Sequence, residues 1–472
     1  MGQVLSVLKK FCEKIYTTDN EHLNLYSFLG CYSNLFVVYR RNNIDKAYSY
    51  LLGLMKCEKS HTNMERMVEQ VPDQEYYQYY NFLSESKWDY KEVNKRTALE
   101  ASALMGGRKA KSGKPTGLII DESSHLKKGV ESVGVARQYA GVSGKVDNCQ
   151  VSVYCSLCNE DNATLIDTAL FLPQKWIDDK QRCDKAHIPE SERIFETKPE
   201  KALTMIKSNL ALGVKFDWIG GDGLYGHNTE LSRGLDKENL FYVLDVHKDE
   251  LIYLEEPCFS VPAKQGKRGA TPTKIKADKP SVRIDKYCND LVENQWDNVE
   301  VRKTAKGLKF VFVHTVAIWH WNGIEEKAQA RTLVITRTQE KNPKVKYSFS
   351  NGTITDYTAK EYAYFQCGRY WVERCFDDAK NEIGLSGYQV RKWIAWQHHQ
   401  SLVMMACLYL LNIRIEKKSE YELMSVRDAR IMIIAHLFSD QDTIAKLHDQ
   451  MLIRHKNRKR DIDRYYKNND DS

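Results

Sequence analysis

The chain has 472 residues, too many for one simple hydrophobic core, so we expect two to four domains. Hydrophobic residues make up 42% and charged residues 28%, as in ordinary globular proteins, and the net charge of +7 permits nucleic-acid binding without requiring it. Twelve cysteines without a signal peptide indicate a reduced, cytoplasmic protein, and the longest apolar run, Leu402 to Leu411, is too short to cross a membrane.

The first part of the chain, residues 1–105, is predicted to be a separate helical domain that is dense in aromatic residues, as in the run EYYQYYNFL. A basic, glycine-rich linker is expected to follow at residues 106–116. This linker is not a phosphate-binding P-loop, because five residues separate Gly107 from Gly113 and Pro115 stands where Ser or Thr is needed.

From Leu118 the pattern changes to short strands, which begin the first part of a catalytic domain at residues 117–246. The runs GLIID, VGVARQYAG and NCQVSVYCSL are predicted strands, and a helix is expected from Lys198 through Leu212. The runs VKFDWIGG and LFYVLDV are two further strands. This order predicts an α/β fold with a ribonuclease-H-like mixed sheet flanked by helices.

Residues 247–350 interrupt this order and are predicted to be a β-rich insertion. Its basic loop, Lys264 to Lys286, has eight basic residues against two acidic ones. The second part of the catalytic domain is expected at residues 351–418, with one helix over Ala359 to Ile383 and a core helix near Lys392 to Ile415. A helix beginning near Ser425 and a basic tail complete the chain at residues 419–472.

Three acidic residues stand where a metal site could be built on such a sheet. Asp121 ends the run GLIID, Asp222 follows the run WIGG, and Glu373 lies on a predicted helix. Carboxylate oxygens are the ligands that hard divalent cations prefer, and two such ions can hold both oxygens of a phosphoryl displacement. Other nearby acids are weaker candidates: Glu122, Asp147, Asp217, Asp377 and Asp378.

A zinc site is the alternative metal centre. Cys155 and Cys158 are spaced as a CxxC pair, and Cys183 and His187 follow. The gap between Cys158 and Cys183 is longer than the common finger loop, and residues three apart on a strand point to opposite faces. The carboxylate site is therefore the preferred interpretation.

The helix that carries Glu373 has two cations in a regular spacing. Arg369 lies four residues before Glu373 and Lys380 lies seven after it, so all three share one helix face. This pattern resembles the Y-x2-R-x3-E-x6-K signature of the DDE transposases of bacterial insertion sequences, in the cut-and-paste branch. Gln366 stands at the Tyr position and departs from the signature.

The resemblance covers most of the chain. The run DESSHLKKGVESVGVARQYAGVSGKVDNCQVSVY is similar to the family's first-Asp block, GGDGLYG to its second, and RYWVERCFDDAKNEIGLSGYQVRKW to its third. It implies Asp121, Asp222 and Glu373 as ligands of two Mg²⁺ ions, which Mn²⁺ can replace, and a β-strand insertion between the second and third acids. Their spacings, 101 and 151 residues, agree with this arrangement.

The family also implies roles toward DNA. Arg369 and Lys380 would contact the cleaved end, and residues 1–105 would recognise it. The remaining candidates for DNA contact are Lys127 and Lys128 after the first Asp, Trp319 and Trp321 for stacking of a flipped base, and Lys267 and Arg268 in the basic loop.

The expected partners are terminal inverted repeats, target DNA and a second copy of the chain on DNA, acting at the bacterial nucleoid without a membrane. A nuclease without strand transfer and a non-catalytic DNA-binding protein are the alternatives.

Overall fold

The architecture comes from a computed structural model that describes residues 24–57, 62–71, 73–263, 271–304, 307–438, 449, 452–453 and 455–464. Five strands form its centre, in the order β6-β5-β3-β7-β8. Strand β3 pairs in parallel with β7, which pairs in parallel with β8, while β5 is antiparallel to both β3 and β6. This arrangement confirms the predicted ribonuclease-H-like mixed sheet. The bounds are Gly117–Leu126 for β3, Lys145–Asn159 for β5, Asn162–Leu170 for β6, Trp218–Gly221 for β7 and Tyr242–Asp245 for β8.

The second predicted strand and the strand after β5 differ from the sequence prediction. The run VGVARQYAG contains only the short strand β4 (Ala136–Ala140), which pairs with the first residues of β5. Strand β6, which the sequence analysis missed, pairs with the second half of β5 across a tight turn at Asn159 and Asn162. The acidic and amide residues of the NEDN sequence form the turn of a long hairpin. The apolar strands on either side of this turn, β5 and β6, are the two arms of the hairpin that the sequence analysis missed.

Alternation along β3 separates the two faces of the sheet. Leu118 and Ile120 belong to a core with helices α6 (Tyr90–Ser112), α9 (Lys198–Leu212) and α11 (Thr229–Lys237). Ile119 belongs to a second core with helices α13 (Ala359–Gly368), α14 (Tyr370–Glu382) and α15 (Trp393–Glu416). Since side chains two apart on a strand share a face, Asp121 lies on the same face as Ile119, towards α14.

Helix α9 has the bounds that the sequence predicted. Thr197 caps its first turn in a reciprocal capping box with Glu200, and Pro199 occupies the first turn, where its missing N–H costs nothing. The helix ends at Gly213, which has a φ of 91°. Glycine adopts this left-handed conformation without the strain that a side chain would add.

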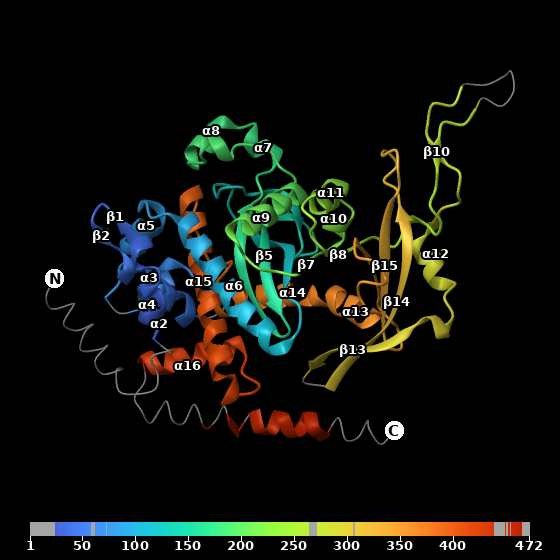
Figure 1. Cartoon of the computed structure of the whole chain (residues 1–472). Coiled ribbons are helices and arrows are strands. Elements are labelled where there is room, and N and C mark those ends of the chain that lie inside the picture. Colours follow the sequence, from blue (N-terminus) through green and yellow to red (C-terminus); the bar gives the residue numbers. More distant parts are fainter. Residues whose placement is uncertain are drawn as a thin grey trace.

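The inserted strands continue the central sheet. Strand β16 pairs with β8, so that the sheet runs through β15, β14 and β9 to twelve strands in the described part of the chain (Figure 1). Strands β10 and β11 form a separate pair on an arm at the upper right of the view. The bounds are Leu251–Tyr253 for β9, Phe259–Ser260 for β10, Lys276–Ala277 for β11, Val282–Arg283 for β12, Asp297–Thr304 for β13, Gly307–His320 for β14, Gln329–Thr338 for β15 and Val345–Ser350 for β16, with helix α12 at Ile284–Asn289.

The predicted linker at 106–116 is largely helical, which corrects that prediction. Helix α6 runs through Ser112, and Gly113, with a φ of 69°, follows its end. Alanine, lysine and arginine are good helix formers, so the segment between Gly107 and Gly113 extends the helix. Only residues 113–116 connect it to β3.

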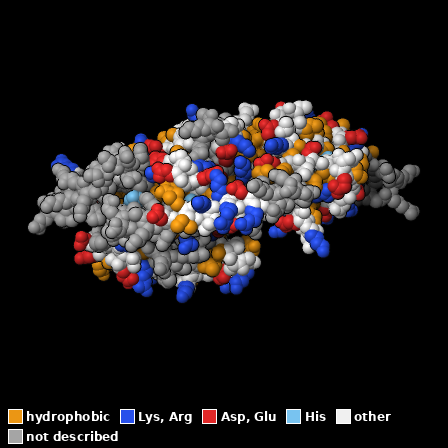
Figure 2. Space-filling view, turned by 90° about the horizontal axis from the view of Figure 1, so that it is seen from below, with side chains coloured by type: hydrophobic (Ala, Val, Ile, Leu, Met, Phe, Trp, Pro, Cys, Tyr) orange, Lys and Arg blue, Asp and Glu red, His pale blue; other side chains and the backbone are white. Residues whose placement is uncertain are grey.

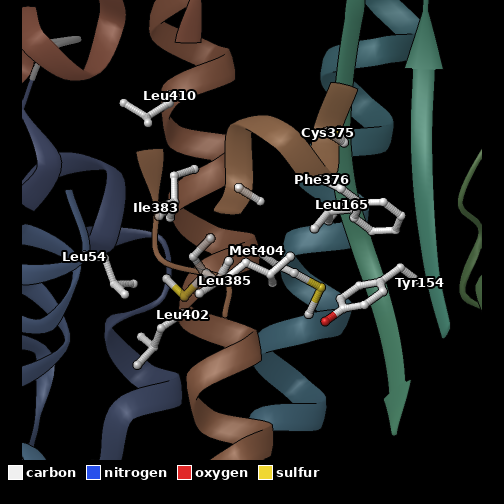
Figure 3. Packing of buried hydrophobic residues seen from close by; sticks show 14 of the residues in the cluster. Leu54, Tyr154, Leu165, Cys375, Phe376, Ile383, Leu385, Leu402, Met404 and Leu410 are labelled. Carbon is white, nitrogen blue, oxygen red and sulfur yellow. The ribbon is translucent and has the colours of Figure 1, made fainter. Parts of the chain in front are cut away.

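The N-terminal helices share one core with the catalytic part. They are α2 (Leu25–Gly30), α3 (Ile44–Lys56), α4 (Met64–Gln70) and α5 (Tyr76–Ser84). Figure 3 shows Leu54 of α3, Leu402 and Met404 of α15, and Tyr154 of β5 around the same packed region. Helix α15 is buried along most of its length, which confirms the predicted core helix.

Two histidines on α15 link it to the N-terminal helices. His398 stacks on Trp88 at 3.7 Å between ring centres and its ring nitrogens reach the carbonyls of Leu83 and Trp88. His399 Nδ1 lies 2.9 Å from the Tyr50 hydroxyl. Both rings are fully buried. The stretch that carries them, residues 397–401, is polar in sequence, yet it is buried within the helix–helix packing.

The C-terminal helix α16 (Val426–Phe438) begins where it was predicted. Among the described residues, no helix combines the length and apolar character needed to span a membrane.

Candidate active site

The first two acids lie side by side at neighbouring strands. Strands β3 and β7 are parallel, with Ile119 opposite Gly220. Continuing that register by two residues places Asp121 opposite Asp222, directly after β7 ends at Gly221. Asp217, by contrast, precedes β7 and accepts a hydrogen bond from the Thr116 amide at the other end of the strand. The strand direction therefore separates Asp222 from this competing acid.

A tight turn holds Asp222 in place. Its carboxylate caps the short helix α10 (Gly223–Gly226) by accepting a hydrogen bond from the Leu224 amide at 3.0 Å. A Cβ at Gly226 would lie 1.9 Å from the backbone oxygen of Asp245. Only glycine permits this approach of α10 to β8, which explains the last glycine of the GGDGLYG run.

Arg369 connects the third acid to the sheet. Its guanidinium has three carboxylate partners: Asp121 at 3.2 Å, Asp245 at 3.2 Å and Glu373 at 2.8 Å, each through a different nitrogen. Arg369 lies at the junction of α13 and α14, so the predicted single helix over 359–383 is divided at this residue. The side chain is 18% exposed, while that of Glu373 is 52% exposed.

Burial and repulsion from neighbouring carboxylates raise the pKa of the two aspartates in this group. Burial, and then the charge of Asp222, raise the pKa of Asp121 to about 7, although Arg369 opposes the shift. Burial and the charge of Glu122 raise the pKa of Asp222. Because like charges in a buried site disfavour ionisation, the arrangement carries more negative charge than its own cation neutralises.

Two acids near the site were not predicted as parts of it. Asp245, at the end of β8, is half-buried, accepts a hydrogen bond from Ser348 at 2.7 Å and pairs with Arg369. Its signal was available, since Asp245 follows the apolar residues of the run LFYVLDV, as Asp121 and Asp222 follow GLII and WIGG. Glu122 forms an ion pair with Lys198 at 2.9 Å and accepts a hydrogen bond from the Tyr225 hydroxyl at 3.1 Å.

Gln366, at the signature's Tyr position, faces the sheet. It is buried, and its amide donates hydrogen bonds to Ser348 Oγ at 2.7 Å and to the Val334 carbonyl at 3.2 Å. Ser348 in turn donates to Asp245. Gln366 therefore connects to the acids through Ser348 and Asp245.

Comparison with known proteins places this geometry in a family. The profile of the DDE superfamily endonucleases matches residues 31–308. The chain belongs to this family. It is also similar to a probable transposase for insertion sequence element IS701 from Microchaete diplosiphon, with 25% identity over 314 residues, covering 66% of this chain and 68% of the relative. A piggyBac transposase in a synaptic complex with hairpin DNA is similar with a TM-score of 0.39 and 11% identity, covering 93% of this chain and 84% of that chain.

The protein is thus a DDE transposase of the insertion-sequence type, an enzyme that cleaves DNA and transfers the cut strand, and it depends on a divalent metal. The profile ends before Glu373, so the third acid depends on the structure and on the signature alone.

The carboxylate oxygens of the DDE transposase's site are of the chemical kind that binds a divalent cation. Asp121 and Asp222 supply hard oxygen ligands, and burial first and neighbouring carboxylates second raise the pKa of each. Glu373 is turned to Arg369, and no group of three His, Cys, Asp or Glu side chains within the described ranges is arranged to hold a metal. Cys155 and Cys158 lie buried on β5, and Cys183 on α8 (Lys180–Lys185).

The predicted DNA-contacting residues lie in different surroundings. Lys380 is largely buried, and burial lowers its pKa while Asp377 and Asp121 oppose the shift. Lys127 donates to the Tyr388 carbonyl at 2.8 Å, and Lys128 is exposed. Trp321 stacks on Phe259 at 4.4 Å, whereas Trp319 is half-buried on β14 beside Tyr253. Lys267 and Arg268 lie outside the described residues.

Proposed function

We propose that this DDE transposase cuts DNA at the terminal inverted repeats of its element and joins the freed 3′-hydroxyl to target DNA, using two Mg²⁺ ions, or Mn²⁺ in their place, held by Asp121, Asp222 and Glu373. The single observation that carries this proposal is the position of Asp121 and Asp222 on neighbouring parallel strands, with Glu373 joined to Asp121 through Arg369. The proposed setting is the cytoplasm, at the bacterial nucleoid.

The side chains of this chain position the reacting groups. Asp121 and Asp222 are fixed by the sheet and by the α10 cap, which gives two ligands of defined spacing. Glu373 is the more exposed acid, so a phosphate from solvent can approach it. When bound, divalent ions supply an activated oxygen nucleophile and stabilise charge on the entering and leaving oxygens.

Arg369 has a second proposed role besides contact with DNA. With three carboxylates around one guanidinium, it holds Asp121 and Glu373 near each other when no other cation is there. Lys380 lies on the same helix and within electrostatic reach of Asp121, which suits it for contact with the phosphate beside the cut.

DNA binding has support from the distribution of charge. Figure 2 shows Lys and Arg side chains gathered near the middle of one face, with some acidic side chains among them. A local excess of cations attracts the phosphate backbone more strongly than the modest overall charge suggests. We assign recognition of the element end to the N-terminal helices, as part of this proposal.

A strand-transfer assay tests the function. Linear DNA bearing one element end, defined by the inverted repeats that flank the gene, is incubated with a supercoiled target and Mg²⁺. We expect a joined product that EDTA abolishes. Cleavage without joining would indicate a nuclease, and binding without cleavage would indicate a non-catalytic DNA-binding protein; both results would contradict the proposal.

The active form is expected to be a dimer assembled on DNA. Two ends must be held together, and each chain supplies one set of acids. Light scattering on the chain with and without element-end DNA should show two chains in the complex that cleaves paired ends. A cleavage-competent pair of ends with a single chain would contradict the dimer. A variant with the basic loop from Lys264 to Lys286 neutralised then tests whether that loop contributes to assembly.

A further inference from the structure

A large cavity opens between the N-terminal helices and the end of β3. Its volume is about 950 Å³. Tyr76 and Tyr80 of α5 line one wall, and the segments after β3 and after α14 line the other. Lys380 belongs to this lining and also acts on the charge of Asp121, so the cavity adjoins the candidate active site.

The charge of this cavity is strongly positive. Among the described residues that line it, Glu131 is the one acid, against six cations: Lys127, Lys128, Lys185, Lys380, Arg391 and Lys392. Lys185 pairs with Glu131, and Lys392 pairs with Glu85 at 2.7 Å. The other four cations have no carboxylate within ion-pair distance in the described part of the chain, and they are available to an anionic ligand.

Specific contacts fix the residues that line the cavity. Lys127 is fixed over the Tyr388 ring at 3.6 Å, and burial lowers the pKa of this lysine to about 7. The loop after α14 packs closely against Thr62, just before α4, since a Cβ at Gly384 or Gly387 would collide with that residue. An uncompensated, buried cation is costly unless an anion completes its surroundings.

We propose that this cavity, the basic cleft, binds a single strand of DNA, with phosphates along Lys127, Lys128, Lys380 and Arg391 and a base stacked on Tyr80. Cations on one wall and aromatic rings on the other are the pattern of single-strand sites. The volume is near the upper end of the range for small-ligand pockets, roughly 300–1,000 Å³, so it admits a few nucleotides but not several base pairs of duplex. A duplex would also offer the tyrosines no exposed base face.

This inference rests on the proposed function, since it assigns the cleft to the strand that runs to or from the acids. The strand would pass Lys380 to reach Asp121, and the N-terminal helices would thereby form part of the substrate channel as well as part of the core. The cleft thus selects an unpaired strand beside the cut.

The test measures binding of a short fluorescent oligothymidylate, and of a duplex of equal length, to the full chain in EDTA over a range of salt concentrations. The combined variant Lys128→Gln with Arg391→Gln should weaken single-strand binding about tenfold at low salt. It should reduce the slope of log affinity against log salt by about 1.4, at about 0.7 per phosphate contact. Both side chains are exposed, so folding is retained.

A second variant separates stacking from charge. Tyr80→Ala should weaken binding by about tenfold without changing the salt slope, and Tyr80→Phe should keep the affinity, because the ring remains. The matched control is Lys215→Gln with Lys237→Gln: both lysines are exposed, and Lys237 lies on α11, which covers the opposite face of the sheet. This control should bind as the unaltered chain does.

The outcomes distinguish the inference from the proposed function. Unchanged oligothymidylate binding in the cleft variants, or a loss confined to duplex, overturns the single-strand site even when strand transfer proceeds. Weakened single-strand binding together with absent strand transfer in the unaltered chain supports the cleft and refutes the function. Melting curves for each variant exclude unfolding as the cause of a loss.

Discussion

Replacing Asp121 or Asp222 with Asn, or Glu373 with Gln, is expected to abolish DNA cleavage while end-binding persists. Each substitution removes a charged oxygen ligand but keeps the size of the side chain. Loss of a residue that merely orients a ligand costs about 10- to 100-fold, so loss of a ligand should exceed about 100-fold. Cleavage of end-labelled DNA at increasing Mg²⁺ concentrations, beside fluorescence anisotropy for binding, measures both effects.

Asp147→Asn is the matched control for these substitutions. Asp147 is an acid on the same sheet, near the start of β5, where it pairs with Gln138, whereas Asp121 pairs with Tyr154 further along β5. The Asp147→Asn variant should cleave DNA at the normal rate. If a variant at one of the three proposed positions cleaved at a near-normal rate in Mg²⁺, that residue would not be a ligand, and Asp245 would be the first acid to test in its place.

Stability provides an independent check on Asp121. Its pKa is raised to about 7 in the folded chain, above about 3.9 for an unfolded chain. The folded state therefore binds the proton more tightly, and the stability from this group is present below about pH 4 and is lost as the pH rises through about 7. In EDTA, Asp121→Asn should accordingly raise the melting temperature at pH 8 and leave it unchanged near pH 4. A variant that melts lower at pH 8 would contradict this account of the site.

Deleting residues 1–105 is expected to unfold the whole chain rather than to remove one function. Helices α3, α5 and α6 pack against α15, and Leu54 and Leu402 belong to one core with Tyr154 of β5. Each large buried side chain that becomes exposed costs about 1.5–3 kcal/mol, and a handful exceeds the total stability of about 5–15 kcal/mol. Circular dichroism and thermal melting of the truncated chain measure this loss.

The control for the deletion is Tyr77→Ser, because Tyr77 is on α5 but 72% exposed, and this variant should melt as the intact chain does. A soluble truncated chain with a cooperative transition would show that the helical segment is independent after all. The role of the segment in end recognition stays a prediction, and replacement of the exposed Arg40 and Arg41 by Gln tests it in a folded protein.

Local patterns in the sequence determined the positions of the main chemical groups. Asp121 and Asp222 each follow an apolar strand run, and Arg369, Glu373 and Lys380 share a helical spacing. Such periodicities depend on the backbone geometry of one element, so a single sequence reveals them. The bounds of α9 and the burial of α15 followed from the same kind of signal.

Contacts between distant segments decided the rest. The ion pairs of Arg369 with Asp121 and Asp245, the inward position of Gln366 and the pairing of β16 with β8 all join residues far apart in the chain. The shared core of the N-terminal helices with α15 and the cavity beside Lys380 have the same origin. A sequence pattern shows which face of an element is apolar, but the partner that covers that face is chosen by packing across the whole fold, and only the tertiary structure contains that choice.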